Sequence, residues 1–219
     1  MIALKHQVPR VDTHILVLYS TSMEKQRKRK SNRDIVLQVA AHLFLTKGYQ
    51  LTSMDDIVDH CKVSKTNIYY HFKSKEDLLL QIMSQFIIHY QERIDTVLGR
   101  SDLSVTEKLE SLLKAITEDN AGTDYLGGCP FITFFTQVSN DLIKVQEMVK
   151  DFFEHQTTLL EKLLSEAIRN KELPEQTPIK QTAALIISSI EGGLFLTKAT
   201  NNPLLLNNIL TSIAFLLKK

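Results

Sequence analysis

The chain has 219 residues, 43% of them hydrophobic, and its 26 Lys and Arg nearly balance its 25 Asp and Glu. Two cysteines are too few for a disulfide framework, and no apolar run approaches the length of a membrane span. Ile15–Tyr19 is too short for the hydrophobic region of a signal peptide, so we expect a cytoplasmic protein with no membrane partner.

The charges are unevenly distributed. Residues 23–90 contain 11 Lys and Arg against 7 Asp and Glu, whereas residues 91–219 contain 13 against 17. A basic excess confined to one segment favours binding to phosphate there. Long stretches of strand-like alternation are missing from the sequence, which predicts an all-α chain.

Residues 1–30 are predicted to form a basic extension outside the folded domains. Met23 is our candidate for the native start, and a short cationic arm, Lys25–Arg33, follows it. Such an arm suits phosphate or minor-groove contact next to a DNA-binding unit. The first helix is expected over Asn32–Lys47, with Gly48 as its left-handed stop.

Thr52–Leu79 predicts a short helix, a tight turn and a second short helix. Ser53 and Asp56 have the spacing of a helix N-cap, so the first helix should span Met54 to about Cys61. Ser64 is a second cap signal and opens a helix to Phe72. Two helices that cross at such a turn can place the second in the major groove of DNA.

The second helix carries an unusual polar face. Ile68 and Phe72, four residues apart, can face a core. This leaves Lys, Thr, Asn, Tyr and His side chains to point elsewhere, and these types contact bases and phosphates. A surface helix with a partly buried aromatic pair is the alternative interpretation.

Residues 48–78, GYQLTSMDDIVDHCKVSKTNIYYHFKSKEDL, strongly resemble the DNA-binding domain of TetR/AcrR-family transcriptional repressors. The resemblance covers about 32–91 and implies an N-terminal three-helix DNA-binding domain over 31–91, an effector-binding and dimerisation domain over 92–219, and about nine helices. It implies base or nearby backbone contacts for one set of residues and phosphate contacts for another. The DNA-binding set is Ser53, Ser64, Lys65, Thr66, Asn67, Tyr69, Tyr70, His71 and Lys75.

Two positions depart from the family pattern. Lys62 replaces the usual glycine of the turn, where a non-glycine residue at positive φ costs about 1 kcal/mol. Thr66 stands where Gly or Ala is common, so no operator sequence of the family can be transferred to this chain.

The second half is predicted to begin with a long helix over Ser74–Leu98, which would link the DNA-binding domain to the effector-binding domain. Further helices are expected over 105–118 and about 142–171. Between these two lies the irregular segment 120–131, in which Pro130 suits the first position of a helix and Cys129 its N-cap. The helix dipole at that N-cap would lower the pKa of the thiol.

Family resemblance places an effector pocket among these helices. An aromatic lining favours a flat or apolar small molecule. The predicted ligand-binding residues are Tyr125, Cys129, Phe131, Phe134, Phe135, Met148, Phe152 and His155. GGCPF also resembles a stretch of one branch of the family that senses electrophiles, so Cys129 is either a sensor or a small buried residue.

The last two helices, 179–200 and 203–217, are apolar on more sides than one chain needs. As in the family, they are predicted to form a four-helix interface of a homodimer that binds a palindromic operator. No nucleophile–base pair, phosphate-binding glycine loop or metal-ligand cluster is present in the sequence, so we expect neither enzyme, metal nor cofactor. An effector-free architectural DNA-binding protein remains an alternative to the inducible repressor.

Overall fold

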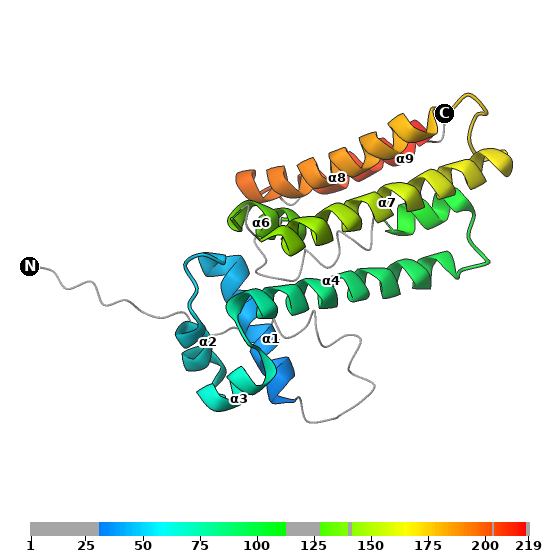
Figure 1. The fold of residues 1–219 in the computed structure, drawn as a ribbon. Helices are drawn as coiled ribbons and strands as arrows, with labels where there is room; N and C mark the ends of the chain where they lie inside the picture. Colours follow the sequence, from blue (N-terminus) through cyan, green and yellow to red (C-terminus); the bar gives the residue numbers. More distant parts are fainter. Residues whose placement is uncertain (1–30, 113–127, 140–141, 203, 218–219) are drawn as a thin grey trace, which may run out of the picture.

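The computed structural model describes residues 31–112, 128–139, 142–202 and 204–217. Within these ranges every regular element is a helix, which confirms the all-α prediction (Figure 1). The predicted basic extension, the proposed start at Met23 and the ligand candidate Tyr125 lie outside the described residues.

Three helices form the N-terminal unit: α1 (Asn32–Leu43), α2 (Met54–Cys61) and α3 (Lys65–His71). Each begins at a serine whose hydroxyl accepts a hydrogen bond from a backbone N–H of the first turn. Leu37, Ile57, Ile68 and Phe72 are fully buried between these helices and α4. The predicted inward pair of the second helix, Ile68 and Phe72, is therefore confirmed.

The first helix does not continue as an α-helix to Lys47. Its last turn is a π-helix, η2 (Phe44–Gly48), and Gly48 has the predicted positive φ, at 101°. The Thr52 hydroxyl donates to the Gly48 carbonyl at 2.8 Å and approaches the Leu43 carbonyl at 3.4 Å. A side chain that reaches into the helix end in this way accounts for the widened turn.

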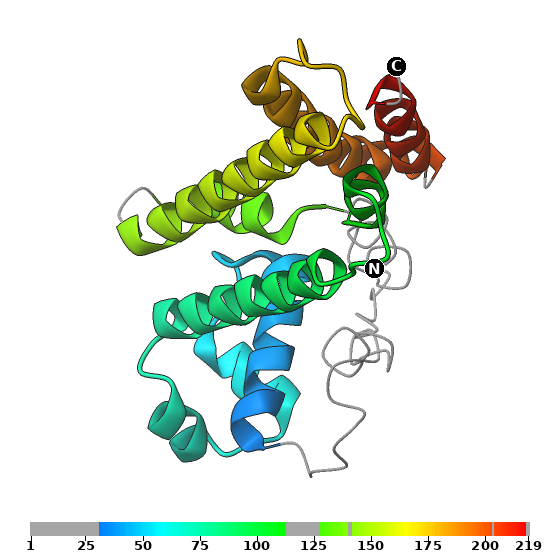
Figure 2. The same cartoon turned by 90° about the vertical axis from the view of Figure 1, so that its right-hand side faces the viewer.

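Helix α4 (Lys75–Leu98) joins the two halves of the molecule. Figure 2 shows α1, α2 and α3 on one side of α4 and α6 to α9 on the other. The α4 side chains Leu78, Leu79, Ile82 and Met83 are fully buried. At about 1.5 Å per residue its 24 residues extend over roughly 35 Å, as the sequence predicted. Residues 105–112 are helical, and the rest of the helix predicted there lies outside the described ranges.

The remaining helices are α6 (Pro130–Gln137), α7 (Ile143–Arg169), α8 (Ile179–Thr200) and α9 (Leu204–Leu217). Helix α7 packs on α4, α8 packs on α7, and α9 packs on α8 (Figure 1). Gly193 makes the last contact close, because a Cβ there would lie 2.8 Å from Ile209 Cδ1 and 2.9 Å from Leu206 Cδ1. The predicted bounds of α8 are confirmed.

One expectation about these helices is wrong. Helix α8 is long and apolar enough to cross a membrane by length and composition, although the sequence suggested no such run. Only 28% of its apolar window is buried in the chain. Because one face packs on α7 and α9 and Leu185, Phe195 and Leu196 stay exposed, the apolarity of α8 exceeds what a single chain uses.

Candidate functional site

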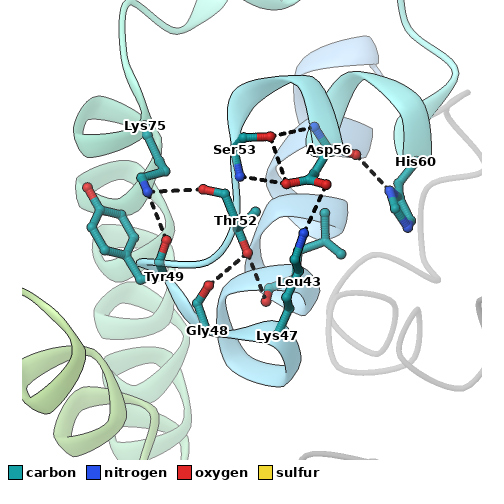
Figure 3. Close-up of polar contacts among 9 residues, drawn as sticks. All are labelled: Leu43, Lys47, Gly48, Tyr49, Thr52, Ser53, Asp56, His60 and Lys75. Carbon is teal, nitrogen blue, oxygen red and sulfur yellow. Dashed lines mark hydrogen bonds and ion pairs between the residues drawn. The ribbon is translucent and has the colours of Figure 1, made fainter.

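A network of polar contacts holds the segment that enters α2 (Figure 3). The Asp56 carboxylate accepts from the Ser53 N–H and hydroxyl, both at 2.7 Å, and pairs with Lys47 at 2.9 Å. These contacts, led by the Ser53 backbone bond, hold the pKa of Asp56 far below its usual range. The Ser53 hydroxyl, a predicted DNA contact, thus has a capping role in the structure.

Lys75 braces the same segment from the first turn of α4. Its ammonium donates to the carbonyls of Tyr49 at 2.9 Å and Thr52 at 3.0 Å, and lies 4.4 Å from the Tyr49 ring centroid (Figure 3). Partial burial lowers the pKa of Lys75. The structure gives this residue a bracing role, and its predicted phosphate contact stays a prediction.

The turn between α2 and α3 requires a left-handed residue. Lys62 occupies it with φ 54° and ψ 26°, so the conformation expected at the missing glycine is present with a lysine in its place. The turn keeps its geometry at the cost of backbone strain.

Lys62→Gly is expected to raise the free energy of unfolding by up to about 1 kcal/mol, because glycine adopts positive φ without a Cβ clash. Lys73→Gly, at an exposed lysine without positive φ, should instead lower stability by about 0.5–1 kcal/mol through chain entropy. Urea denaturation of both variants measures the contrast. Equal losses in the two variants would show that the turn is not strained.

Helix α3 presents most of its polar residues to solvent. Lys65 and Thr66 are exposed, and the exposed fractions of Tyr70 and Tyr69 are 82% and 43%. Asn67 and His71 are half-buried. Lys65 Nζ donates to Asp55 Oδ1 at 2.7 Å, which ties the start of α3 to α2 and raises the pKa of Lys65. Ser64 caps the helix by accepting from the Asn67 N–H at 3.3 Å.

A largely apolar cavity lies between α4, α6, α7, α8 and the helix at 105–112. The empty space inside it, counted together with the part that is open solvent, amounts to about 910 Å³. Its polar or ionisable lining residues come from four elements. The described lining is His89, Tyr90, Arg93, Ile94, Leu109, Leu112, Cys129, Phe152, Phe153, Gln156, Leu159, Leu160, Ile187, Ile190 and Glu191.

Helix α6 connects this cavity to the N-terminal unit. Cys129, the N-cap of α6, lines the cavity, and Gln137, its last residue, accepts from the Tyr49 N–H at 2.8 Å through Oε1. The helix is only 8 residues long, so about 12 Å of rigid structure separates the two ends. Tyr49 is the residue whose carbonyl also binds Lys75.

Two family models match the chain. The model of bacterial regulatory proteins of the tetR family matches residues 36–82, and that of the tetracyclin repressor-like C-terminal domain matches residues 105–213. The chain belongs to the TetR family. It is therefore a helix-turn-helix DNA-binding transcriptional regulator and not an enzyme.

Individual TetR-family relatives agree with this assignment. An uncharacterised regulator of Lactococcus lactis is 28% identical over 176 residues, covering 79% of this chain and 86% of the relative. The repressor ComR of Escherichia coli is 25% identical over 166 residues, covering 76% and 79%. A TetR regulator of Legionella pneumophila aligns with a TM-score of 0.75 at 25% identity, covering 87% of this chain and all of that structure.

Of the predicted ligand-binding residues, Cys129 and Phe152 line the cavity. Phe131 and Phe134 are fully buried behind it, where Phe131 stacks on Phe152 at 3.9 Å between ring centroids. Phe135 and His155 are exposed on the outer faces of their helices, and Met148 is half-buried outside the described lining. Consecutive aromatic residues on a helix point to different sides, so composition alone overestimated the number of aromatic side chains that line the cavity.

Sequence reasoning missed the polar residues of the cavity. His89, Tyr90 and Arg93 come from α4, Gln156 from α7 and Glu191 from α8. One signal was available for Glu191, which is the single acidic residue of the apolar helix 179–200. A lone carboxylate in an apolar helix indicates either a partner or a site.

The sequence predicted a lowered pKa for the Cys129 thiol, and this prediction is wrong in direction. Its pKa is raised well above the usual value, first because the thiol is buried and second because Glu191 lies close to it. Hydrogen bonds from the backbone N–H groups of Ile132 and Phe131 favour the thiolate but are outweighed. A thiol held protonated is a poor nucleophile, which removes the reason to place electrophile sensing here.

Proposed function

We propose that this chain is a repressor that binds a palindromic operator as a homodimer and releases it when a small molecule fills the cavity. The observation that carries the proposal is an exposed polar helix, α3, on a unit joined to the cavity by both α4 and α6. Several curated relatives bear the name repressor, among them ComR and KstR2. Such a protein works in the cytoplasm, with double-stranded DNA as its partner.

The predicted DNA contacts form one group in this proposal. Lys65, Thr66 and Asn67 would meet base edges or the adjacent backbone, beside Ser64 at the start of α3. Tyr69, Tyr70 and His71 would contact phosphates, with Ser53 and Lys75 at the starts of α2 and α4. Their exposure supports this assignment most strongly for Lys65, Thr66 and Tyr70.

Release of DNA would follow from the shared helices. A ligand that contacts Tyr90 and Arg93 acts on α4, whose first residue, Lys75, holds the segment before α2. Moving α4 or α6 would change the placement of α3 relative to its copy in the dimer. A coupling of about 1–3 kcal/mol corresponds to a roughly 5- to 150-fold change in operator affinity, and DNA must weaken ligand binding equally.

Two measurements with the promoter fragment of the chain's own gene test the proposal: fluorescence anisotropy for affinity and stoichiometry, and nuclease footprinting for the site that is bound. We expect saturable binding by two chains per operator, a palindromic footprint, and competition by unrelated DNA only at much higher concentration. Log affinity should fall with log salt by about 0.9 for each phosphate neutralised. A footprint indifferent to sequence would favour an architectural DNA-binding protein and contradict a repressor.

Gln137→Ala is expected to loosen the contact between α6 and the N-terminal unit, because the Tyr49 N–H loses its acceptor. Amide hydrogen exchange of the peptide spanning 44–53 should become several-fold faster. Thr136→Ala is the matched control, since that exposed hydroxyl binds only carbonyls of α6 itself. Equal exchange in Gln137→Ala and the wild type would remove α6 from the proposed route.

A further inference from the structure

Glu191 is the unusual group of the cavity. It lies on α8 among apolar lining residues, and its Oε2 atom is buried without a hydrogen-bond partner in the described part of the chain. Burial raises the pKa of Glu191, and the interaction with the Cys129 thiol offsets this only in part. An enclosed carboxylate oxygen without a partner is costly, so a site of this kind is completed by a group that the chain does not supply.

The rings beside Glu191 suit a positive charge. Tyr90 and Phe152 line the cavity with centroids 5.6 Å apart at 76°, and Phe153 meets Phe152 at 5.2 Å and 74°. Aromatic rings attract cations through their π-electrons, so a wall built from three such rings is compatible with a positively charged group in the cavity. The Tyr90 hydroxyl, held neutral because burial raises the pKa of Tyr90, adds a polar group without adding charge.

Two basic groups also line the cavity, on α4. Both His89 and Arg93 already have interactions within the protein. Burial and the neighbouring Arg93 lower the pKa of His89, which favours the neutral imidazole. Among the described residues no ion pair involves Glu191, so its carboxyl group can pair with a cation that the chain does not supply.

We propose that the cavity binds a lipophilic cation, a flat or elongated apolar molecule whose positively charged nitrogen pairs with Glu191. The apolar body lies among Ile187, Leu159 and the aromatic rings, and the nitrogen replaces the missing partner of the carboxylate. Because the last torsion of a glutamate side chain is broad, rotation about it can turn the buried Oε2 atom toward the ligand. This assignment rests on the proposed function, since it names the effector class of the same cavity.

Three probes of matched shape test the charge preference: 9-aminoacridine, a cation at pH 7.5, acridine, which is neutral there, and anthracene-9-carboxylate, an anion. Their binding to the full chain is followed by ligand fluorescence without DNA, and the lack of tryptophan keeps the protein background low. We expect the cation to bind at least 10-fold more tightly than acridine and the anion most weakly. Preference for the anion would assign the cavity to Arg93 and His89 and overturn the proposal.

Glu191→Gln keeps the shape of the side chain and removes its charge. We expect this variant to bind 9-aminoacridine at least 10-fold more weakly and acridine within about 3-fold of the wild type. Glu147→Gln, on the exposed face of α7, is the matched control and should leave all three affinities unchanged. If Glu191→Gln retains cation binding, Glu191 is not the anchor.

Operator release is measured separately, by adding 9-aminoacridine to the DNA complexes of the wild type and of Glu191→Gln. Because this probe also intercalates into DNA, only release that is lost in Glu191→Gln is assigned to the cavity. Binding that depends on Glu191 but does not release DNA would contradict the proposed induction and leave the ligand class standing. DNA release by other compounds, with no cation binding, would contradict the ligand class and leave the proposed function standing.

Discussion

Replacing Phe195 and Phe215 by Asp is expected to convert a dimer into monomers and to abolish operator binding. Their exposed fractions are 65% and 58%, and they lie on α8 and α9, the two helices with more apolar surface than the chain itself covers. A buried interface does not accept unpaired carboxylates, and single aromatic anchors commonly contribute 2 kcal/mol or more. The dimer dissociation constant should therefore rise at least about 100-fold.

The exposed face of α8 is shaped for a close partner. Leu185, Ser188, Gly192 and Phe195 follow one another at helical spacing. A Cβ at Gly192 would meet nothing within 4 Å, whereas one at Gly193 would meet α9. Gly193 thus permits the close contact between α8 and α9 inside the chain. Gly192 leaves space on the surface where a helix of a second chain can approach.

Analytical ultracentrifugation over a range of concentrations measures the change, with Ile143→Asp as control. Ile143 is 61% exposed at the start of α7, so its replacement removes similar apolar surface away from α8 and α9. The control should remain dimeric and bind DNA. A wild-type monomer, or a double variant that still dimerises, would contradict the proposed interface.

Local signals in the sequence were sufficient for the N-terminal unit. Ser53, Ser64 and Ser74 marked three helix starts, and the hydroxyl of each accepts a hydrogen bond from the backbone N–H three residues further on. The missing glycine at Lys62 correctly indicated a left-handed turn. These features depend on residues within four positions of one another, so a short sequence pattern contains the information.

The cavity could not be predicted in the same way. Its polar groups Tyr90, Gln156 and Glu191 lie far apart in the chain and meet only through helix packing. The pKa of Cys129 depends on the same packing, because burial and Glu191 outweigh the helix end. Likewise, the π-turn that ends at Gly48 is accounted for by Thr52, whose hydroxyl donates back to the Gly48 carbonyl.

Removing the exposed side chains of α3 should have the second large effect. The double variant Lys65→Ala, Tyr70→Ala is expected to bind its operator about 100-fold more weakly, because one cationic and one hydroxyl contact are lost. The salt slope of log affinity should fall by about 0.9 for the lysine. Since both side chains are exposed, the melting temperature should change by less than about 3 °C.

Asp55 provides a test of opposite sign on the same contact. In the free protein Lys65 pairs with Asp55, and that carboxylate would also face the DNA phosphates. Asp55→Asn should therefore strengthen operator binding several-fold, with dimerisation unchanged. Lys144→Ala, on the exposed start of α7, is the control for loss of a positive charge and should leave affinity within 2-fold. For the double variant Lys65→Ala, Tyr70→Ala of the preceding prediction, operator affinity that stays unaltered in a folded dimer would mean that another surface binds DNA.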